Sequence, residues 1–154
     1  MDPEARLREI GHELPEVPEP AGAYVPASRS GALIFTAGQL PFEGGELSMT
    51  GKVGETVTPE KAREAARLCA LNALAAAAAE AGGLSRVARV VRITGYIPSA
   101  PGFNGQPEVL NGASELIGEV FGEAGLHARS AVGVAELPLD APVEVELVAE
   151  LGDS

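Results

Sequence analysis

The residues best suited to do chemistry lie near the end of the chain, in the segment 125–151. Arg129 stands between small residues and is followed by an apolar run, Ser130–Ala135. A second run, Val143–Leu151, alternates strictly, and one face of it carries Glu144, Glu146 and Glu150. A guanidinium can grip a carboxylate because its planar fork matches two oxygens at once. Arg129 is therefore a candidate for binding a carboxylate ligand or for a buried ion pair.

Period-two alternation with β-branched residues is typical of strands with one buried face. The two runs, separated by the proline-containing connection Leu137–Pro142, predict a hairpin-like pair of strands. In that arrangement Arg129 and Glu144 would share the face of the sheet that no helix covers. The row of glutamates is then either part of a catalytic site or a solvated face.

Other reactive side chains are few. His127, just before the arginine, is either a general base or a loop histidine, and His12 lies in the N-terminal region. Ser130 has no base in sequence reach, so a catalytic triad is not supported. Two histidines and one cysteine without metal-ligand spacing predict no metal site. Cys69 and Asn72, three residues apart on an expected helix, are interpreted as packing plus a satisfied amide.

Composition limits the classes of partner. The chain has 154 residues and a formal net charge of −11, which argues against general affinity for nucleic acid or anionic membranes. The single cysteine excludes an internal disulfide and fits a reducing compartment. The first residues lack the apolar region of a secretory signal, and the longest apolar run is too short to span a bilayer. We expect a cytoplasmic protein with no membrane or nucleic-acid partner.

The elements follow the order β-β-α-β-α-β-β within one domain, residues 1–154, in which residues 1–22 form a short helix and a proline-rich arm. Before the last two strands, the periodicity, caps and turns predict a helix within Pro3–Glu13, strands at Tyr24–Ser28 and Ala32–Gln39, a helix from Thr58 to Ala81, a strand at Ala88–Ile97 and a helix over Pro107–Glu123. This order indicates an α+β fold, a mixed sheet with two main helices on one face. A symmetric oligomer would cover the other face.

Several blocks of this chain resemble the Rid family, also called YjgF-like and formerly labelled L-PSP endoribonucleases. They are Tyr24-Val25, TAGQLP at 36–41, VLNGASELIGEVFGE at 109–123 and ARSAVGVAELPLDAPVEVELVAEL at 128–151. The closer likeness is to a Rid-like branch with a longer N-terminal arm and without the cysteine two residues after the arginine. The resemblance covers about residues 20–151 and implies the chorismate-mutase-like fold, assembled as a homotrimer with clefts between subunits.

The resemblance also implies a reaction and its residues. Arg129 would grip the carboxylate of a 2-imino acid or enamine, such as 2-aminoacrylate. Glu144 and the main-chain carbonyl of Ala131 would hold the attacking water, and the products would be a 2-ketoacid and ammonia. The cleft would be lined by Tyr24, Gly38 and Asn111. No cofactor or metal is implied.

The location of the site follows from its need for enclosure. A flat sheet face cannot surround a small ligand, so a neighbouring subunit would complete the cleft. Arg129, Ala131 and Glu144 would come from one chain. Arg129 would be buried there and, without ligand, paired with a carboxylate such as Glu144.

Two alternatives to imine hydrolysis remain. The same cleft could hold a small carboxylate, such as a 2-ketoacid, in a non-catalytic binding or regulatory trimer; Ala131, in place of cysteine, motivates this reading. An endoribonuclease or translation inhibitor, from the old family label, is disfavoured by the acidity of the chain and by the lack of paired histidines for acid–base cleavage.

Overall fold

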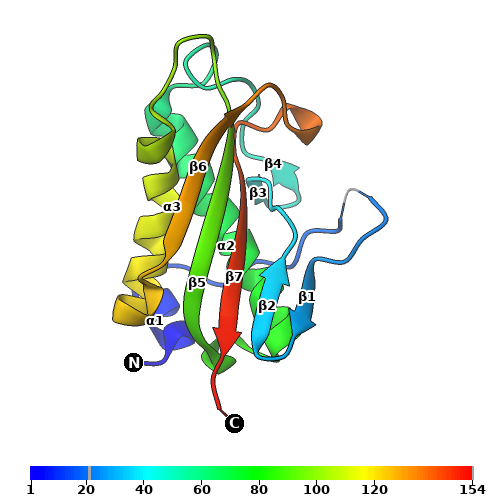
Figure 1. Ribbon diagram of the computed structural model, residues 1–154, viewed down its shortest axis with the longest axis vertical. Coiled ribbons are helices and arrows are strands. Elements are labelled where there is room, and N and C mark those ends of the chain that lie inside the picture. Colours follow the sequence, from blue (N-terminus) through cyan, green and yellow to red (C-terminus); the bar gives the residue numbers. More distant parts are fainter. Residues whose placement is uncertain (21, 154) are drawn as a thin grey trace.

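The computed structural model describes residues 1–20 and 22–153. Ala21, in the predicted arm, and Ser154, at the end of the predicted domain, lie outside the described residues. A five-stranded sheet has the order β1-β2-β7-β5-β6, and helices α2 and α3 cover one of its faces (Figure 1). The predicted α+β fold, with a mixed sheet and two main helices on one face, is confirmed.

The elements have the following bounds: α1 Pro3–Glu9, β1 Ala27–Ser30, β2 Leu33–Thr36, β3 Phe42–Glu43, β4 Glu46–Leu47, α2 Pro59–Ala81, β5 Val87–Pro98, α3 Gln106–Phe121, β6 Ala128–Val134 and β7 Glu144–Leu151. Short 3₁₀ helices lie at η1 Leu84–Arg86, η2 Gly122–Gly125 and η3 Pro138–Asp140. The first two strands are shorter than predicted and start later. None of the helices in the described residues has the length and apolarity needed to cross a bilayer.

Helix α2 begins and ends where the sequence predicted. The Thr58 hydroxyl accepts a hydrogen bond from the backbone N–H of Lys61 at 3.2 Å, and proline occupies the first helical position. Gly82 ends the helix in the left-handed conformation, with φ of 87°. Within α2, the side-chain amide of Asn72 donates hydrogen bonds to the carbonyls of Leu40 and Phe42 at 3.0 and 3.1 Å. The predicted structural role of this amide is therefore confirmed.

Two glycines let α3 lie close to its neighbours. A Cβ on Gly112 would collide with the carbonyl oxygen of Arg63 in α2. A Cβ on Gly95, in β5, would come within 2.5 Å of the Leu110 side chain. Because contacts this short do not occur in folded proteins, glycine at these positions fixes the depth at which α3 packs on α2 and the sheet. This packing places the N-terminal half of α3 beside the edge strand β6.

The prediction of a hairpin between the last two strands is wrong. β6 pairs with β5 in parallel, whereas β7 pairs with β5 antiparallel on the other side. The connecting segment 135–143, which contains η3, leads the chain past the end of β5. Figure 1 shows β5 between the two strands. The short-range pattern of two amphipathic runs and a turn was correct, but the turn is long enough to let another strand lie between them.

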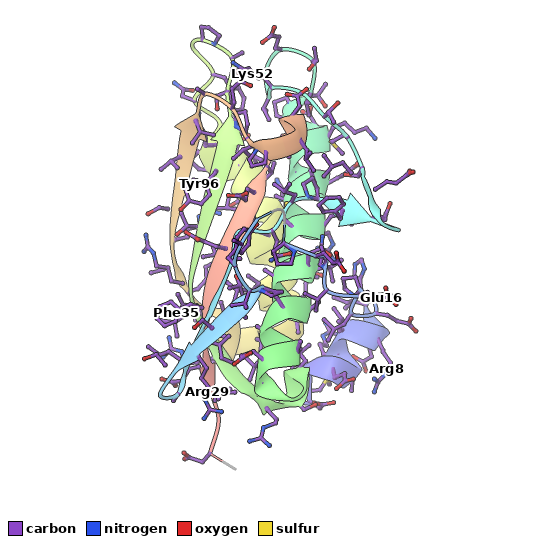
Figure 2. All side chains as sticks on the ribbon, turned by 90° about the vertical axis from the view of Figure 1, so that its right-hand side faces the viewer. Arg8, Glu16, Arg29, Phe35, Lys52 and Tyr96 are labelled. Atoms are coloured by element: carbon purple, nitrogen blue, oxygen red, sulfur yellow. The ribbon has the colours of Figure 1, made fainter. Side chains whose placement is uncertain are left out.

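The two faces of the sheet differ in composition. The helix-covered face contributes buried aliphatic side chains to the core: Ile34, Val90, Ile93, Ile97, Val145, Leu147 and Ala149. The other face, here called the open face, carries Phe35, which is 44% exposed, and the Tyr96–Glu146 hydrogen bond. Figure 2 shows Phe35 and Tyr96 on the side of the sheet away from the helices. The open face therefore combines polar side chains with the exposed ring of Phe35.

Candidate functional site

Arg129 is held by the first turns of α3. Its Nη1 donates a hydrogen bond to the Ser114 hydroxyl at 3.1 Å, and its Nη2 donates to the main-chain carbonyl of Pro107 at 2.9 Å. Both acceptors are neutral. The ion pairs found among the described residues do not include Arg129, so the expected pairing with a carboxylate, such as Glu144, is absent from the single chain.

The strand register places Arg129 on the helix-covered face. Arg129 lies opposite Ile93, whose side chain is fully buried in the core, whereas Glu144 lies opposite Tyr96. Ile93 and Tyr96 are three residues apart on one strand, so their side chains point to opposite faces. The expectation that Arg129 and Glu144 share the open face is therefore wrong.

Asn111 and Ala131 belong with Arg129. Asn111 follows Pro107 by four positions and precedes Ser114 by three, so all three lie on the same side of α3. Ala131 lies opposite Gly95 in β5 and packs partly buried against the core. β6 is an edge strand, and half of the main-chain groups of such a strand face away from its neighbour. We call Asn111, Arg129 and Ala131 the arginine half-site.

A second cluster forms around Glu144. A Cβ on Gly38 would come within 2.6 Å of the Glu144 carboxyl carbon, so glycine is what allows this carboxylate to lie against the backbone there. Gly38 and Tyr24 line the same small cavity of about 50 Å³, and the Tyr24 side chain is 52% exposed. We call Tyr24, Gly38 and Glu144 the carboxylate half-site.

The environment of Glu144 favours its protonated form. Burial raises the pKa of Glu144, and the nearby charge of Glu146 raises that pKa further. Glu146 accepts a hydrogen bond of 2.6 Å from the Tyr96 hydroxyl. That bond is the main cause that raises the pKa of Tyr96 to about 12, so Tyr96 stays a neutral donor and Glu146 stays an acceptor. A carboxyl group whose pKa lies above its ordinary value is suited to exchanging protons closer to neutral pH.

The two half-sites do not meet within one chain. β6 and β7 lie on either side of β5, about 10 Å apart, and Arg129 and Glu144 are offset by three residues along β5, about 10 Å more. Their Cα atoms are thus about 14 Å apart and their side chains leave opposite faces of the sheet. The sequence-predicted residues form two separate groups, of which one lies at an edge of the sheet and the other near its open face.

Two further side chains, Ser114 and His127, lie beside Arg129. His127 lies within hydrogen-bond distance of Ser114 Oγ through Nε2, at 3.0 Å, and of the Gly125 carbonyl through Nδ1, at 2.6 Å. Ser114 could have been found from its helical spacing to Asn111, but nothing local indicates that β6 lies beside it. No group of three or more potential metal-ligating side chains occurs in the part of the chain that the structure describes.

Comparison with known proteins identifies relatives across nearly the whole chain. The family model described as "YjgF/chorismate mutase-like, putative endoribonuclease" matches residues 4–151. Protein TCP17 of Trypanosoma cruzi is 44% identical over 150 residues, covering 97% of this chain and 94% of that protein. The crystal structure of Atu1372 from Agrobacterium tumefaciens, described as of unknown function, is 45% identical with a TM-score of 0.90, covering 98% of this chain and 94% of that one.

A more distant structure was solved with an amino acid. Escherichia coli TdcF with bound serine is 26% identical with a TM-score of 0.66, covering 89% of this chain and 94% of that one. The match of the family model to almost every residue, together with relatives of more than 40% identity over almost their full length, shows the family. The chain belongs to the YjgF/chorismate mutase-like family.

Proposed function

We propose that this protein hydrolyses reactive 2-imino acids and their enamine tautomers to 2-ketoacids and ammonia, in clefts between the subunits of a homotrimer. The observation that carries the proposal is the state of Arg129. Its guanidinium is fixed by two neutral acceptors and is left without a carboxylate partner. A held, uncompensated guanidinium at a sheet edge is suited to bind a carboxylate ligand. The serine in TdcF, which also has a carboxylate beside a nitrogen-bearing carbon, supports the same ligand class.

The chemistry requires a clamp, a water molecule and a route for protons. Arg129 would fix the substrate carboxylate, with Asn111 beside it. A water held by Glu144 and the Ala131 carbonyl would add its oxygen to the imine carbon while a proton moves to the nitrogen. The carbon–nitrogen bond of that adduct then breaks, so that one water is consumed and ammonia leaves. An enamine first takes a proton on carbon. Positioning can supply much of the acceleration because such imines are already labile, and no cofactor is required.

The composite cleft follows from the separation of the two half-sites. Since Arg129 and Glu144 leave opposite faces of one sheet, a substrate that touches both must lie between two chains. In a closed trimer, the arginine half-site of one subunit would face the carboxylate half-site of the next, with Tyr24 and Gly38 on the second wall. Sedimentation equilibrium should give a trimer at micromolar protein concentration; a monomer would contradict the cleft.

The direct test is ammonia release from imines generated in situ by an amino-acid oxidase. We expect wild-type protein to accelerate 2-ketoacid and ammonia formation and Arg129→Lys to lose most of the effect, because an ammonium lacks the two-pronged contact. Glu144→Gln should keep binding but lose turnover. Wild-type rates equal to buffer would reject the deaminase proposal.

A non-catalytic role is the second candidate, and Ala131 favours it because this position, two residues after the arginine, lacks a reactive side chain. Calorimetry with pyruvate separates the two: binding by protein that fails the imine assay would support a sensor or carrier of small carboxylates. RNA cleavage that survives purification and disappears in Arg129→Ala would instead support the ribonuclease name of the family. We assign either activity to the cytoplasm, in keeping with the buried free thiol of Cys69.

A further inference from the structure

Four groups form one line of hydrogen bonds that ends at the arginine half-site. The Gly125 carbonyl lies 2.6 Å from His127 Nδ1, His127 Nε2 lies 3.0 Å from Ser114 Oγ, and Ser114 Oγ lies 3.1 Å from Arg129 Nη1. The line joins α3, the loop before β6 and β6 itself. It therefore links three segments that meet at this corner of the molecule.

For the neutral form of the His127 ring, the direction of every bond in the line follows from chemistry. A carbonyl oxygen can only accept, so His127 Nδ1 carries the hydrogen that faces Gly125. In a neutral ring Nε2 then has a lone pair, so the Ser114 hydroxyl donates to it. The lone pairs of Ser114 Oγ are left to accept from Arg129, which can only donate. Each donor thus points to the next acceptor, from Arg129 through Ser114 and His127 to Gly125, and hydrogen bonds aligned in this way strengthen one another.

Gly125 is placed for this contact. A Cβ at this position would come within 2.6 Å of the Ile117 carbonyl oxygen, so a glycine is what lets η2 lie against the last turns of α3. Gly125 itself is buried. Its carbonyl then stands within reach of the imidazole two residues later. The acceptor at the end of the line is consequently a fixed point of the fold rather than a mobile loop atom.

The line controls the orientation of the guanidinium. Arg129 has five N–H groups, of which one on Nη1 and one on Nη2 are used by Ser114 and Pro107. The remaining three stay available for a ligand. Two anchors on different nitrogens fix the plane of the fork, whereas one anchor alone lets it turn. The Pro107 acceptor is a main-chain carbonyl, which does not depend on the side chain. Ser114, oriented by His127, is therefore the anchor that a side-chain substitution can remove.

We propose that Ser114 and His127 are positioning residues, whose hydrogen-bond relay orients Arg129 to bind the carboxylate of the substrate. This inference rests on the proposed function. His127 does not act as the general base, because both of its ring nitrogens are already engaged within the protein. The relay makes the ligand clamp a preformed one, which lowers the cost of ordering the arginine when the ligand arrives.

The test is steady-state imine hydrolysis by Ser114→Ala and His127→Leu. We expect KM to rise about 5- to 10-fold in each, the loss of roughly one hydrogen bond, with kcat changed by less than about twofold, because the carboxylate contact is the same in ground and transition states. Ser114→Thr keeps the hydroxyl and His127→Gln keeps an acceptor, so both variants should have a KM close to that of wild type. The double variant should be no worse than about the poorer single one, since both act through one bond to Arg129.

A second measurement does not depend on turnover. The ¹⁵N spectrum of the imidazoles, in which His12 serves as internal reference because the sequence has only two histidines, should show neutral His127 protonated on Nδ1. The Nε2 resonance of His127 should shift in Ser114→Ala. A neutral ring protonated on Nε2, or unchanged KM in both variants of an active enzyme, would overturn the relay alone. Wild-type protein that neither hydrolyses imines nor binds pyruvate would overturn the proposed function and the role of the relay with it.

Discussion

At the scale of single residues, Glu146 affects the ionisation of its neighbour Glu144. The two carboxylates alternate on one strand and leave the same face of the sheet. Glu146 is bound to the Tyr96 hydroxyl across the neighbouring strand, at 2.6 Å, and so is kept in place as an acceptor. Its charge contributes to the raised pKa of Glu144. The pair is therefore an arrangement in which one carboxylate adjusts the proton affinity of the other.

Glu146→Gln should lower the pKa of Tyr96 from about 12 toward the ordinary value of a phenol. The carboxylate accepts a strong hydrogen bond from the phenol and repels the phenolate, whereas the neutral amide accepts a weaker bond and does not repel the phenolate. Ultraviolet absorption of the ionised phenol, followed through an alkaline titration, measures this directly. Glu150→Gln, on the same strand and face, is the matched control and should leave the titration of Tyr96 unchanged. Equal titrations in wild type and Glu146→Gln would contradict the assignment.

Glu144→Gln should change how stability depends on pH. The folded-state pKa of Glu144 is raised, so the folded protein holds a proton that the unfolded chain releases. The resulting stability is present below the ordinary carboxyl pKa and is lost as pH rises through the raised pKa. The free energy of unfolding of Glu144→Gln, relative to wild type, should therefore improve as pH rises from about 4 to about 7.

Urea denaturation at a series of pH values and a fixed protein concentration checks this expectation. Glu43→Gln, at an exposed position in the β3–β4 hairpin, is the control and should leave the pH dependence as it is. If the free energies of unfolding of wild type and Glu144→Gln changed in parallel over the whole pH range, the pKa of Glu144 would not be raised in the folded protein.

The sequence pattern singles out candidate site residues but does not show on which face of the sheet each one lies. Alternation along β7 showed that Glu144 and Glu146 share a side, and the structure agrees. Alternation does not show which side of the sheet Arg129 faces, because that depends on the register between β6 and β5. The registers that place Arg129 opposite Ile93 and Glu144 opposite Tyr96 are long-range facts. Ser114 was missed for the same reason.

At the scale of elements, helices α2 and α3 lie as close together as their backbones allow at Gly112. Gly112 faces the carbonyl of Arg63 with no room for a methyl group, while Gly118, six residues later on α3, has open space around it. Both are glycines in a helix interior, where alanine is otherwise preferred. They differ only in what lies opposite, which makes them a matched pair.

Gly112→Ala should therefore lower the free energy of unfolding by about 1–3 kcal/mol, the usual cost of overpacking. Gly118→Ala should raise it by about 0.5–1 kcal/mol, because alanine loses less backbone entropy in a helix. Thermal unfolding followed by circular dichroism at 222 nm measures both. If Gly112→Ala were as stable as Gly118→Ala, the close packing of α2 and α3 would not be a determinant of the fold.

The elements themselves were largely predictable because their signals are local. The cap at Thr58 and the end of α2 at Gly82 lie where the sequence predicts them. The strands with which β6 and β7 pair were not predictable, because a hairpin and a connection that passes over another strand share the same local pattern. The parallel pairing of β5 with β6 decides between them, and this pairing joins residues too far apart in the sequence to be recognised from a local segment.

At the scale of the whole molecule, the proposed cleft predicts that two defective proteins can repair each other. In a trimer with shared clefts, Arg129→Ala spoils one wall of each cleft and Glu144→Gln the other. Co-expressed in equal amounts, the two should recover about one quarter of wild-type activity, since about three quarters of random trimers are mixed and each holds one intact cleft. Differently tagged chains, purified in tandem, give the mixed trimers alone, which should show about one third of wild-type activity in the imine assay.

Separate Arg129→Ala and Glu144→Gln proteins, mixed without subunit exchange, are the control and should stay inactive. Inactive mixed trimers, assembled from variants that are each stably folded, would show that both residues serve a site within one chain. That result would conflict with the opposite faces from which the two side chains leave the sheet.

The place of β7 has a consequence for how the protein is made. β7 is the middle strand of the sheet and pairs with both β2 and β5, yet it follows every other strand in the sequence. Until β7 has been synthesised, we expect the β1–β2 pair and the β5–β6 pair to lack the strand that joins them into one sheet. They join only when the last strand has left the ribosome. Folding of this protein is thus a late event in translation, and the incomplete chain is the form most in need of chaperones.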